Sequence, residues 1–309
     1  MKITISTILA AFVASAVVGA QEGRFQQEAI LIDGPDEWQQ VWIMDANKTT
    51  MRYYETVKGV DAKDRRISSP AGIWFMEPKP YTEAMELYQG RQYEEAAKKF
   101  GEIREYYERL REIPGNHSSL SAFYQLECYR KLGKLDELKV AIDKFLPIDR
   151  ESLARPHHLE QLKLYDMWDA VRVKDWSRLE RIAEDRLKEK MPGYQRAQVG
   201  YCYGMALEGL KKPIKAINAY NIGMTADTGA SEFIARQSAL NALRLYWADE
   251  SLQFAIRMYD TPDRDDQSSA SFRLREAASL AALYKLTIGG GEPLPDDFEK
   301  LLKYLPKEQ

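Results

Sequence analysis

The chain has 309 residues, of which 45% are hydrophobic and 29% charged, a composition that is ordinary for a folded protein and excludes a largely disordered chain. Lysine and arginine number 44 against 47 aspartate and glutamate residues, so the net charge is −3 with neutral histidines. A chain without excess positive charge lacks the electrostatic footprint of a protein that binds duplex nucleic acid, and we exclude that class of partner.

The first twenty residues have the pattern of a secretory signal peptide. An uncharged apolar run occupies residues 3–20, and the small side chains of Val18 and Ala20 precede Gln21 at the spacing that a signal peptidase recognises. We therefore expect cleavage after Ala20 and a mature chain that is periplasmic or secreted, with no transmembrane span. A retained N-terminal anchor is the alternative, because a run of this length could just cross a bilayer. Gln21 stands where a lipoprotein would carry cysteine, so no lipid anchor is expected.

Residues 21–80 are predicted to form a small β-rich module. Short runs rich in β-branched and aromatic residues are separated by turn residues, and Asn47-Lys48 between two of them indicates a hairpin. The predicted strands are 28–33, 40–46, 49–57, 65–69 and 71–78.

Strands this short need a third or fourth neighbour, or a helical surface, for stability. We expect a small sheet that caps the following helices, and an independent ligand-binding barrel is the alternative. The core of this module is expected to contain Trp38, Trp42, Trp74 and Phe75.

From Tyr81 onward the apolar residues recur at helical spacing, and the chain repeats. Each unit has a first amphipathic helix, a turn, and a second helix that carries an apolar pair four residues apart. The units cover 81–103, 121–146, 159–187, 196–223 and 238–259. The first members of the apolar pairs are Ala96, Leu138, Leu179, Ala216 and Ala255, so the intervals are 42, 41, 37 and 39 residues.

This pattern resembles the tetratricopeptide repeat, a helix–turn–helix unit with small residues where its two helices cross, such as Gly204 here. The intervals exceed the 34 residues of that family, and leucine replaces alanine in two units, so the repeats are divergent. A related helical-hairpin solenoid is the alternative. The resemblance covers 81–287 and implies a mainly α fold, a solenoid of about five to six units preceded by the β-rich module.

The last units are expected to end the solenoid. A sixth first helix at 268–287 is followed by three glycines and by Pro293 and Pro295, where no helix can continue. Residues 288–309 are then a capping helix and tail, because a solenoid must cover its last apolar face. Cys128 and Cys202 lie two units apart, and we expect two buried free thiols.

A search for catalytic chemistry finds little. His157 and His158 are adjacent, so on a helix entrance they point in different directions, and no third metal ligand accompanies them or His117. The chain has no phosphate-binding glycine loop and no Gly-x-Ser-x-Gly elbow. Acidic pairs such as Glu94-Glu95 are typical of a solvated helix face. We therefore expect no enzymatic activity, no metal and no cofactor.

The resemblance places a docking groove on the concave side, which the first helix of each unit lines. The family register assigns to it Tyr81, Tyr88, Phe123, Arg130, Trp168, Arg172, Tyr201, Met205, Arg244 and Trp247. Aromatic, methionine and arginine side chains dominate protein interfaces, and the three arginines could clamp a partner's carboxylates. The alternative for the aromatic residues is packing against the next unit.

The leading hypothesis is a non-enzymatic exported scaffold or adaptor that binds a peptide or protein partner in the cell envelope through this concave groove. The alternative is a protein that binds a carbohydrate or another small ligand, in which Trp168, Tyr201 and Trp247 stack on sugar rings.

Overall fold

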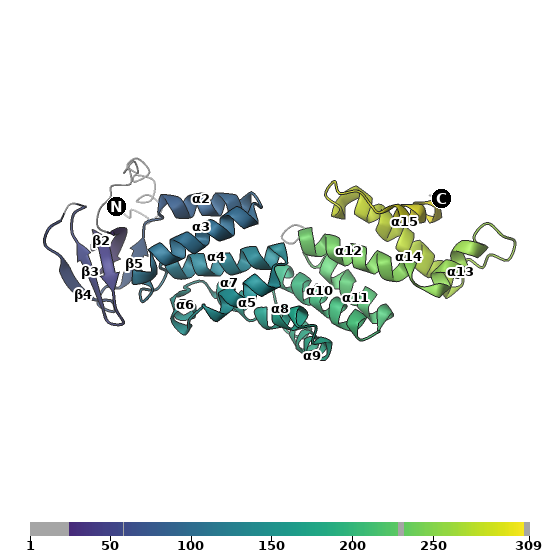
Figure 1. Ribbon diagram of the computed structural model, residues 1–309, viewed down its shortest axis with the longest axis horizontal. Helices are drawn as coiled ribbons and strands as arrows, with labels where there is room; N and C mark the ends of the chain where they lie inside the picture. The colour runs from purple at the N-terminus through teal and green to yellow at the C-terminus, as the bar shows by residue number, and fades with distance from the viewer. Residues whose placement is uncertain (1–24, 58, 228–231, 306–309) are drawn as a thin grey trace.

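The computed structural model describes residues 25–57, 59–227 and 232–305, so the predicted signal peptide and its cleavage site lie outside the described residues. Figure 1 shows an elongated molecule, with a small sheet at the N-terminal end and helices that follow one another to the other end. The predicted mainly α fold behind a small sheet is confirmed. No helix of the described segments combines the length and apolarity that a membrane span requires.

The sheet contains five strands, each of which overlaps one of the predicted strands. They are β1 (Gln27–Ile32), β2 (Trp38–Ala46), β3 (Thr50–Tyr54), β4 (Lys63–Arg66) and β5 (Gly72–Phe75), all antiparallel, in the order β4-β3-β2-β1-β5. The predicted hairpin between β2 and β3 is confirmed, and the Asn47 side chain closes its turn by accepting hydrogen bonds from the backbone N–H groups of Thr49 and Thr50.

One face of the sheet packs on the helices. Ala29, Leu31, Val41 and Ile43 alternate with more exposed residues along β1 and β2, as a strand with one buried face requires. They share a hydrophobic cluster with helical residues such as Phe100. The described sheet therefore caps the helical part through a common core, and the alternative of an independent barrel is not supported.

The expectation that three tryptophans fill this core is wrong. Trp38 and Trp74 are 50% and 62% exposed, Trp42 is partly buried, and only Phe75 joins the cluster. The strand period of two explains the error, because it places Trp74 and Phe75 on opposite faces of β5.

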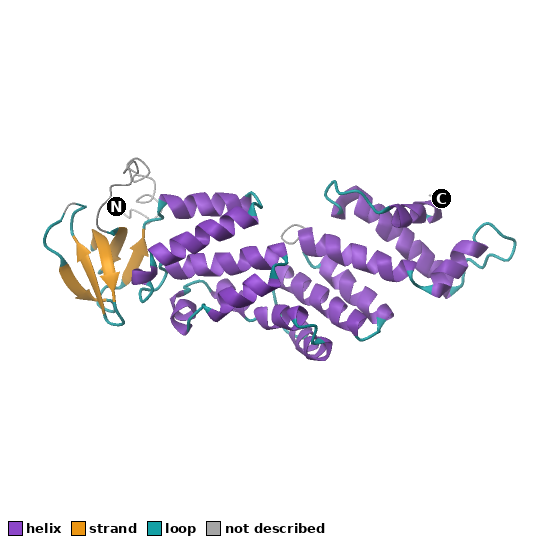
Figure 2. Cartoon of the chain, in the orientation of Figure 1, coloured by secondary structure: helices purple, strands orange, loops and turns teal. Residues whose placement is uncertain are grey.

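Helices and the loops that join them make up the rest of the described chain (Figure 2). They are α2 (Lys79–Gln89), α3 (Tyr93–Tyr106), α4 (His117–Leu132), α5 (Leu135–Asp143), α6 (Pro147–Ser152), α7 (Pro156–Leu162), α8 (Tyr165–Arg172), α9 (Trp176–Leu187), α10 (Gly193–Gly209), α11 (Pro213–Thr225), α12 (Glu232–Trp247), α13 (Glu250–Met258), α14 (Ser269–Leu283) and α15 (Asp296–Glu299). Shorter turns are η1 (Glu108–Leu110), η2 (Tyr284–Ile288) and η3 (Lys300–Tyr304). Long helices pack on their neighbours in the chain, as α3 does on α4 and α10 on α11.

Two predicted helices are broken in the structure. The first helix of the third unit divides into α7 and α8, and α6 precedes it. Prolines at the start of α6 and α7 set where these two short helices begin, since proline suits a first helical turn but interrupts a continuing helix. The break between α7 and α8 falls at Lys163 and Leu164 and involves no proline. The last helix is α15 followed by the 3₁₀ turn η3.

The sequence repeat corresponds to a recurring turn. Four turns between paired helices contain one residue with positive φ: Arg91 (62°), Gly133 (69°), Lys174 (57°) and Lys211 (60°). After each of them, the next backbone N–H donates to the carbonyl five residues earlier, a closure of the Schellman type. These residues lie 42, 41 and 37 residues apart, the intervals found in the sequence. The turn before α13 is different and is closed by the Asp249 side chain.

The shared turn predicts opposite effects of two substitutions. Lysine is strained at positive φ and glycine is not. Lys211→Gly is expected to stabilise the fold by about 0.5 kcal/mol and Gly133→Ala to destabilise it by about 1 kcal/mol. A methyl group at position 133 meets nothing within 4 Å, so its effect is purely conformational. Urea unfolding checks both values, and a stabilising Gly133→Ala would contradict the shared turn.

The crossing of α10 and α11 depends on small residues, as predicted for Gly204. The ring of Tyr220 lies directly against Gly204, where a side chain has no room. The two cysteines are free and buried, which confirms that expectation. Burial raises the pKa of the Cys128 thiol to about 12, so it stays protonated at neutral pH.

Candidate functional site

Half of the ten residues assigned to the concave groove are buried. Tyr88, Arg172, Met205 and Trp247 are partly buried, and Arg244 is exposed. The buried members are Tyr81, Phe123, Arg130, Trp168 and Tyr201.

Packing accounts for the buried aromatic residues. The Phe123 ring lies 4.3 Å from the His158 ring, between centroids, and Trp168 Nε1 donates to Gln198 Oε1 at 3.2 Å. These side chains fill contacts between neighbouring helices, so they offer no surface to a partner in this structure. Trp168 and Tyr201 likewise have no free ring face for a sugar.

The three groove arginines each have a carboxylate within the chain. Arg130 donates to both Glu127 oxygens at 2.8 and 2.7 Å, and Arg172 Nη2 donates to Asp169 at 2.9 Å. Arg244 Nη2 lies 2.7 Å from the Glu208 carboxylate. Only Arg130 is buried with its carboxylate, so only Arg130 has a wholly internal role, while Arg172 is partly exposed and Arg244 is 50% exposed.

The pair of Glu127 and Arg130 is buried, with 7% and 5% of each residue exposed. Burial alone would raise the pKa of Glu127, but the charge and hydrogen bonds of Arg130 keep that pKa below its usual value. Tyr165 Oη also donates to Glu127 Oε1, at 2.7 Å. The cluster therefore joins α4 to α8 through a fully satisfied carboxylate.

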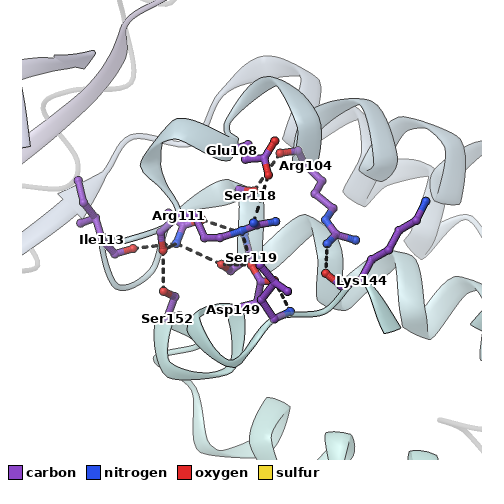
Figure 3. A network of polar contacts seen from close by, with 11 residues as sticks. Arg104, Glu108, Arg111, Ile113, Ser118, Ser119, Lys144, Asp149 and Ser152 are labelled. Carbon is purple, nitrogen blue, oxygen red and sulfur yellow. Dashed lines mark hydrogen bonds and ion pairs between the residues drawn. The ribbon is translucent and has the colours of Figure 1, made fainter. Parts of the chain in front are cut away.

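A second buried network ties α6 to the start of α4 (Figure 3). Asp149 is fully buried, and its Oδ1 accepts from Ser119 Oγ at 2.9 Å and lies 3.0 Å from Arg111 Nε. Its Oδ2 accepts from the Leu146 backbone N–H at 2.9 Å, and Ser152 Oγ donates to the Arg111 carbonyl at 2.8 Å. Because each Asp149 oxygen already has partners, the network serves structure rather than catalysis.

Two histidines are buried, and at least one ring nitrogen of each lacks a hydrogen-bond partner among the described residues. His117 and His158 are 5% and 1% exposed. Neither ring nitrogen of His158, and not Nδ1 of His117, has a hydrogen-bond partner among the described residues. Aromatic rings surround both imidazoles, and burial lowers the pKa of each to about 4. Both are neutral at pH 7 and act as core side chains.

Open cavities lie at the other end of the molecule, on either side of α14. The first has a volume of about 530 Å³ and lies between the end of α13, the loop before α14, and η3. It is lined by Tyr259, Arg264, Leu274, Arg275, Lys303 and Tyr304 among others. The second has a volume of about 410 Å³ and is lined by Asn221, Tyr246, Phe272, Arg275, Glu276 and Leu280 among others. Arg275 lines both cavities.

Two of the three cations around the first cavity are neutralised by carboxylates. Lys303 Nζ lies 2.6 Å from Asp260, and Arg264 Nε lies 2.6 Å from Asp266. The rings of Tyr259 and Tyr304 meet edge to face with centroids 4.7 Å apart. The first cavity thus combines two aromatic walls with balanced ion pairs.

Arg275 differs from these cations. Its Nη1 donates to the backbone carbonyl of Asp266 at 3.0 Å, and its guanidinium lies 4.5 Å from the centroid of the Phe272 ring. Within residues 25–57, 59–227 and 232–305, no carboxylate forms an ion pair with it. Phe272 is 51% exposed. An exposed aromatic ring under an uncompensated arginine is a typical feature of an interaction surface.

Phe272 and Arg275 are not among the site residues predicted from the sequence. Their separation of three residues places both on one face of α14, while the alanines that follow face the core. This spacing is visible in the sequence, but the two positions are not among those that the repeat family uses to line its groove. We define the α14 surface by the residues that line these two cavities.

Comparison of the chain with models of protein families, with curated proteins and with solved structures finds no match.

Proposed function

We propose that the protein is a non-enzymatic, exported scaffold or adaptor that binds a segment of a protein partner in the cell envelope. The array of helices that carries this function is proposed to be a divergent tetratricopeptide-like solenoid. The recurring positive-φ turn supports this architecture, because four hairpins share one closure at the intervals of the sequence repeat. Export rests on the signal-peptide pattern at residues 1–20.

The α14 surface is the proposed binding site in place of the concave groove. The observation that carries this choice is the pair of cavities that share Arg275 and expose the Phe272 ring. Aromatic and arginine side chains in pockets contribute most of the energy in protein interfaces. In the predicted groove, by contrast, five of the ten assigned residues are buried in the core.

Site-specific photo-crosslinking in the native cell tests this site. Phe254 on α13 is a matched control for Phe272, because it is 53% exposed, lies under Arg257 and lines neither cavity. A crosslinker at position 272 is expected to capture one defined partner that position 254 does not capture. With that partner purified, Phe272→Ala is expected to weaken binding about tenfold or more, and Phe254→Ala to leave it unchanged. Equal effects of both substitutions would reject the site.

Carbohydrate binding remains a second candidate function, at a different place from the one expected. Trp74 is 62% exposed on the outer face of the sheet, where Ile30 pairs with both Trp74 and Gln40 across neighbouring strands. Gln40 Nε2 donates to Glu28 Oε1 on the same face. An indole ring can stack on the apolar face of a sugar ring, and neighbouring amide and carboxylate groups can form hydrogen bonds with its hydroxyls.

Glycan-array binding tests this second candidate. We expect Trp74→Ala to abolish any signal and Phe272→Ala to preserve it. Absence of binding to every glycan, or a signal that Trp74→Ala leaves unchanged, would reject the sheet as a carbohydrate site.

A further inference from the structure

We infer that the α14 surface recognises a peptide segment in which an acidic residue stands beside an apolar one, and that Arg275 binds the acidic side chain. This inference rests on the proposed function, since it names the partner chemistry of the same site.

The position of Arg275 leaves most of its hydrogen-bonding capacity unused. A guanidinium carries five N–H donors in a planar fork. The described contacts use Nη1, which donates to the Asp266 carbonyl at 3.0 Å. Stacking 4.5 Å above the Phe272 ring centroid restricts the orientation of the fork before any ligand arrives. A carboxylate can therefore bind with two parallel hydrogen bonds at a small cost in side-chain entropy.

The charges around the first cavity favour an anionic ligand at this point. Among the charged residues that line this cavity, Lys303 is paired with Asp260 and Arg264 with Asp266, so one positive charge remains there, on Arg275, while Glu276 lines only the second cavity. A ligand carboxylate beside Arg275 can form an ion pair with it without displacing either of the existing ion pairs.

The second cavity favours an apolar neighbour of that acidic residue. Phe272, Tyr246 and Leu280 supply its apolar wall. Its one carboxylate, Glu276, accepts a hydrogen bond from Tyr246 Oη at 3.2 Å and forms no ion pair with Arg275 in the described structure. The acidic side chain is therefore assigned to the first-cavity side of Arg275. A free inorganic anion would leave this apolar wall uncovered, which favours a peptide.

Fluorescence anisotropy with two synthetic peptides tests the inference on the full-length mature protein. One labelled octapeptide alternates leucine and glutamate. The uncharged control peptide has the same length and alternates leucine and glutamine. The leucine–glutamate peptide is expected to bind about tenfold or more tightly than the control peptide at low salt. The difference is expected to shrink as salt screens this partly exposed site.

Arg275→Gln is expected to remove the preference for the glutamate peptide. Arg257→Gln serves as the matched control, because it removes an arginine that also lies over an exposed phenylalanine but lines neither cavity. A thermal melt of each variant verifies that the fold is retained.

The outcomes separate the inference from the proposed function. If both peptides bind equally and Phe272→Ala weakens both, the α14 surface binds peptides but the acidic preference is overturned. If neither peptide binds at millimolar concentration, the inference is overturned, and the crosslinking comparison of positions 272 and 254 decides the proposed function independently. A glutamate preference that survives Arg275→Gln also overturns it.

Discussion

Replacing Arg130 with alanine is expected to lower the free energy of unfolding by about 3–5 kcal/mol, because it leaves the buried Glu127 carboxylate without its cation. The lost contacts are two hydrogen bonds of 2.8 and 2.7 Å. If Arg130 lined an open groove instead, the same substitution would cost no more than a surface ion pair, about 0–1 kcal/mol. Urea unfolding at neutral pH measures the difference.

Arg172→Ala is the matched control for this experiment. Arg172 also pairs with a carboxylate three residues earlier, but the side chains of Arg172 and Asp169 are 27% and 23% exposed. We expect a loss of about 1 kcal/mol or less. The double variant Glu127→Gln with Arg130→Met should be more stable than Arg130→Ala alone, because no unpaired charge remains. Equal losses for Arg130→Ala and Arg172→Ala would contradict a buried pair.

Stability is expected to fall by about 2 kcal/mol for each of His117 and His158 when the pH is lowered from 7.5 to 5. Burial holds the pKa of each folded imidazole at about 4, whereas the unfolded side chain titrates near 6.5. Between these values the unfolded chain binds more protons, so stability is complete above the unfolded pKa and declines as the pH falls towards the folded pKa.

Denaturant unfolding at several pH values checks this effect, and pH 5 avoids most of the carboxylate titration. The charged and titratable neighbours of His158 are His157, Arg155 and Glu127. His158→Leu is expected to reduce the pH dependence by about half. A pH dependence that is the same in His158→Leu and the unaltered protein would contradict a buried, neutral His158.

Local patterns predicted the elements of this fold well. Turn residues divided the β-rich module into its five strands, because Asn47 and its neighbours favour a turn through their own side-chain hydrogen bonds. The alignment on Ala96, Leu138, Leu179 and Ala216 found the repeat, since each of these residues lies five positions after the positive-φ residue of its turn.

Burial was harder to predict, because it depends on which faces meet in three dimensions. Arg130 was placed on an open surface, although Glu127 at helical spacing was available as its partner inside the core. Trp74 was placed in the core, although its neighbour Phe75 occupies the inward position of the same strand. The first cavity forms where α14 meets η3, and the second forms where α14 meets α11 and α12. Such meetings of distant segments cannot be read from one stretch of sequence.

Hydrogen exchange, measured on the purified protein with and without the partner captured at position 272, tests most directly where that partner binds. The proposed site predicts that protection on binding appears in α14 and in the segments around Tyr259 and Tyr304. Protection confined to α2, α4, α8 and α10, with α14 unchanged, would show that the partner occupies the concave side and would contradict the α14 surface as the binding site.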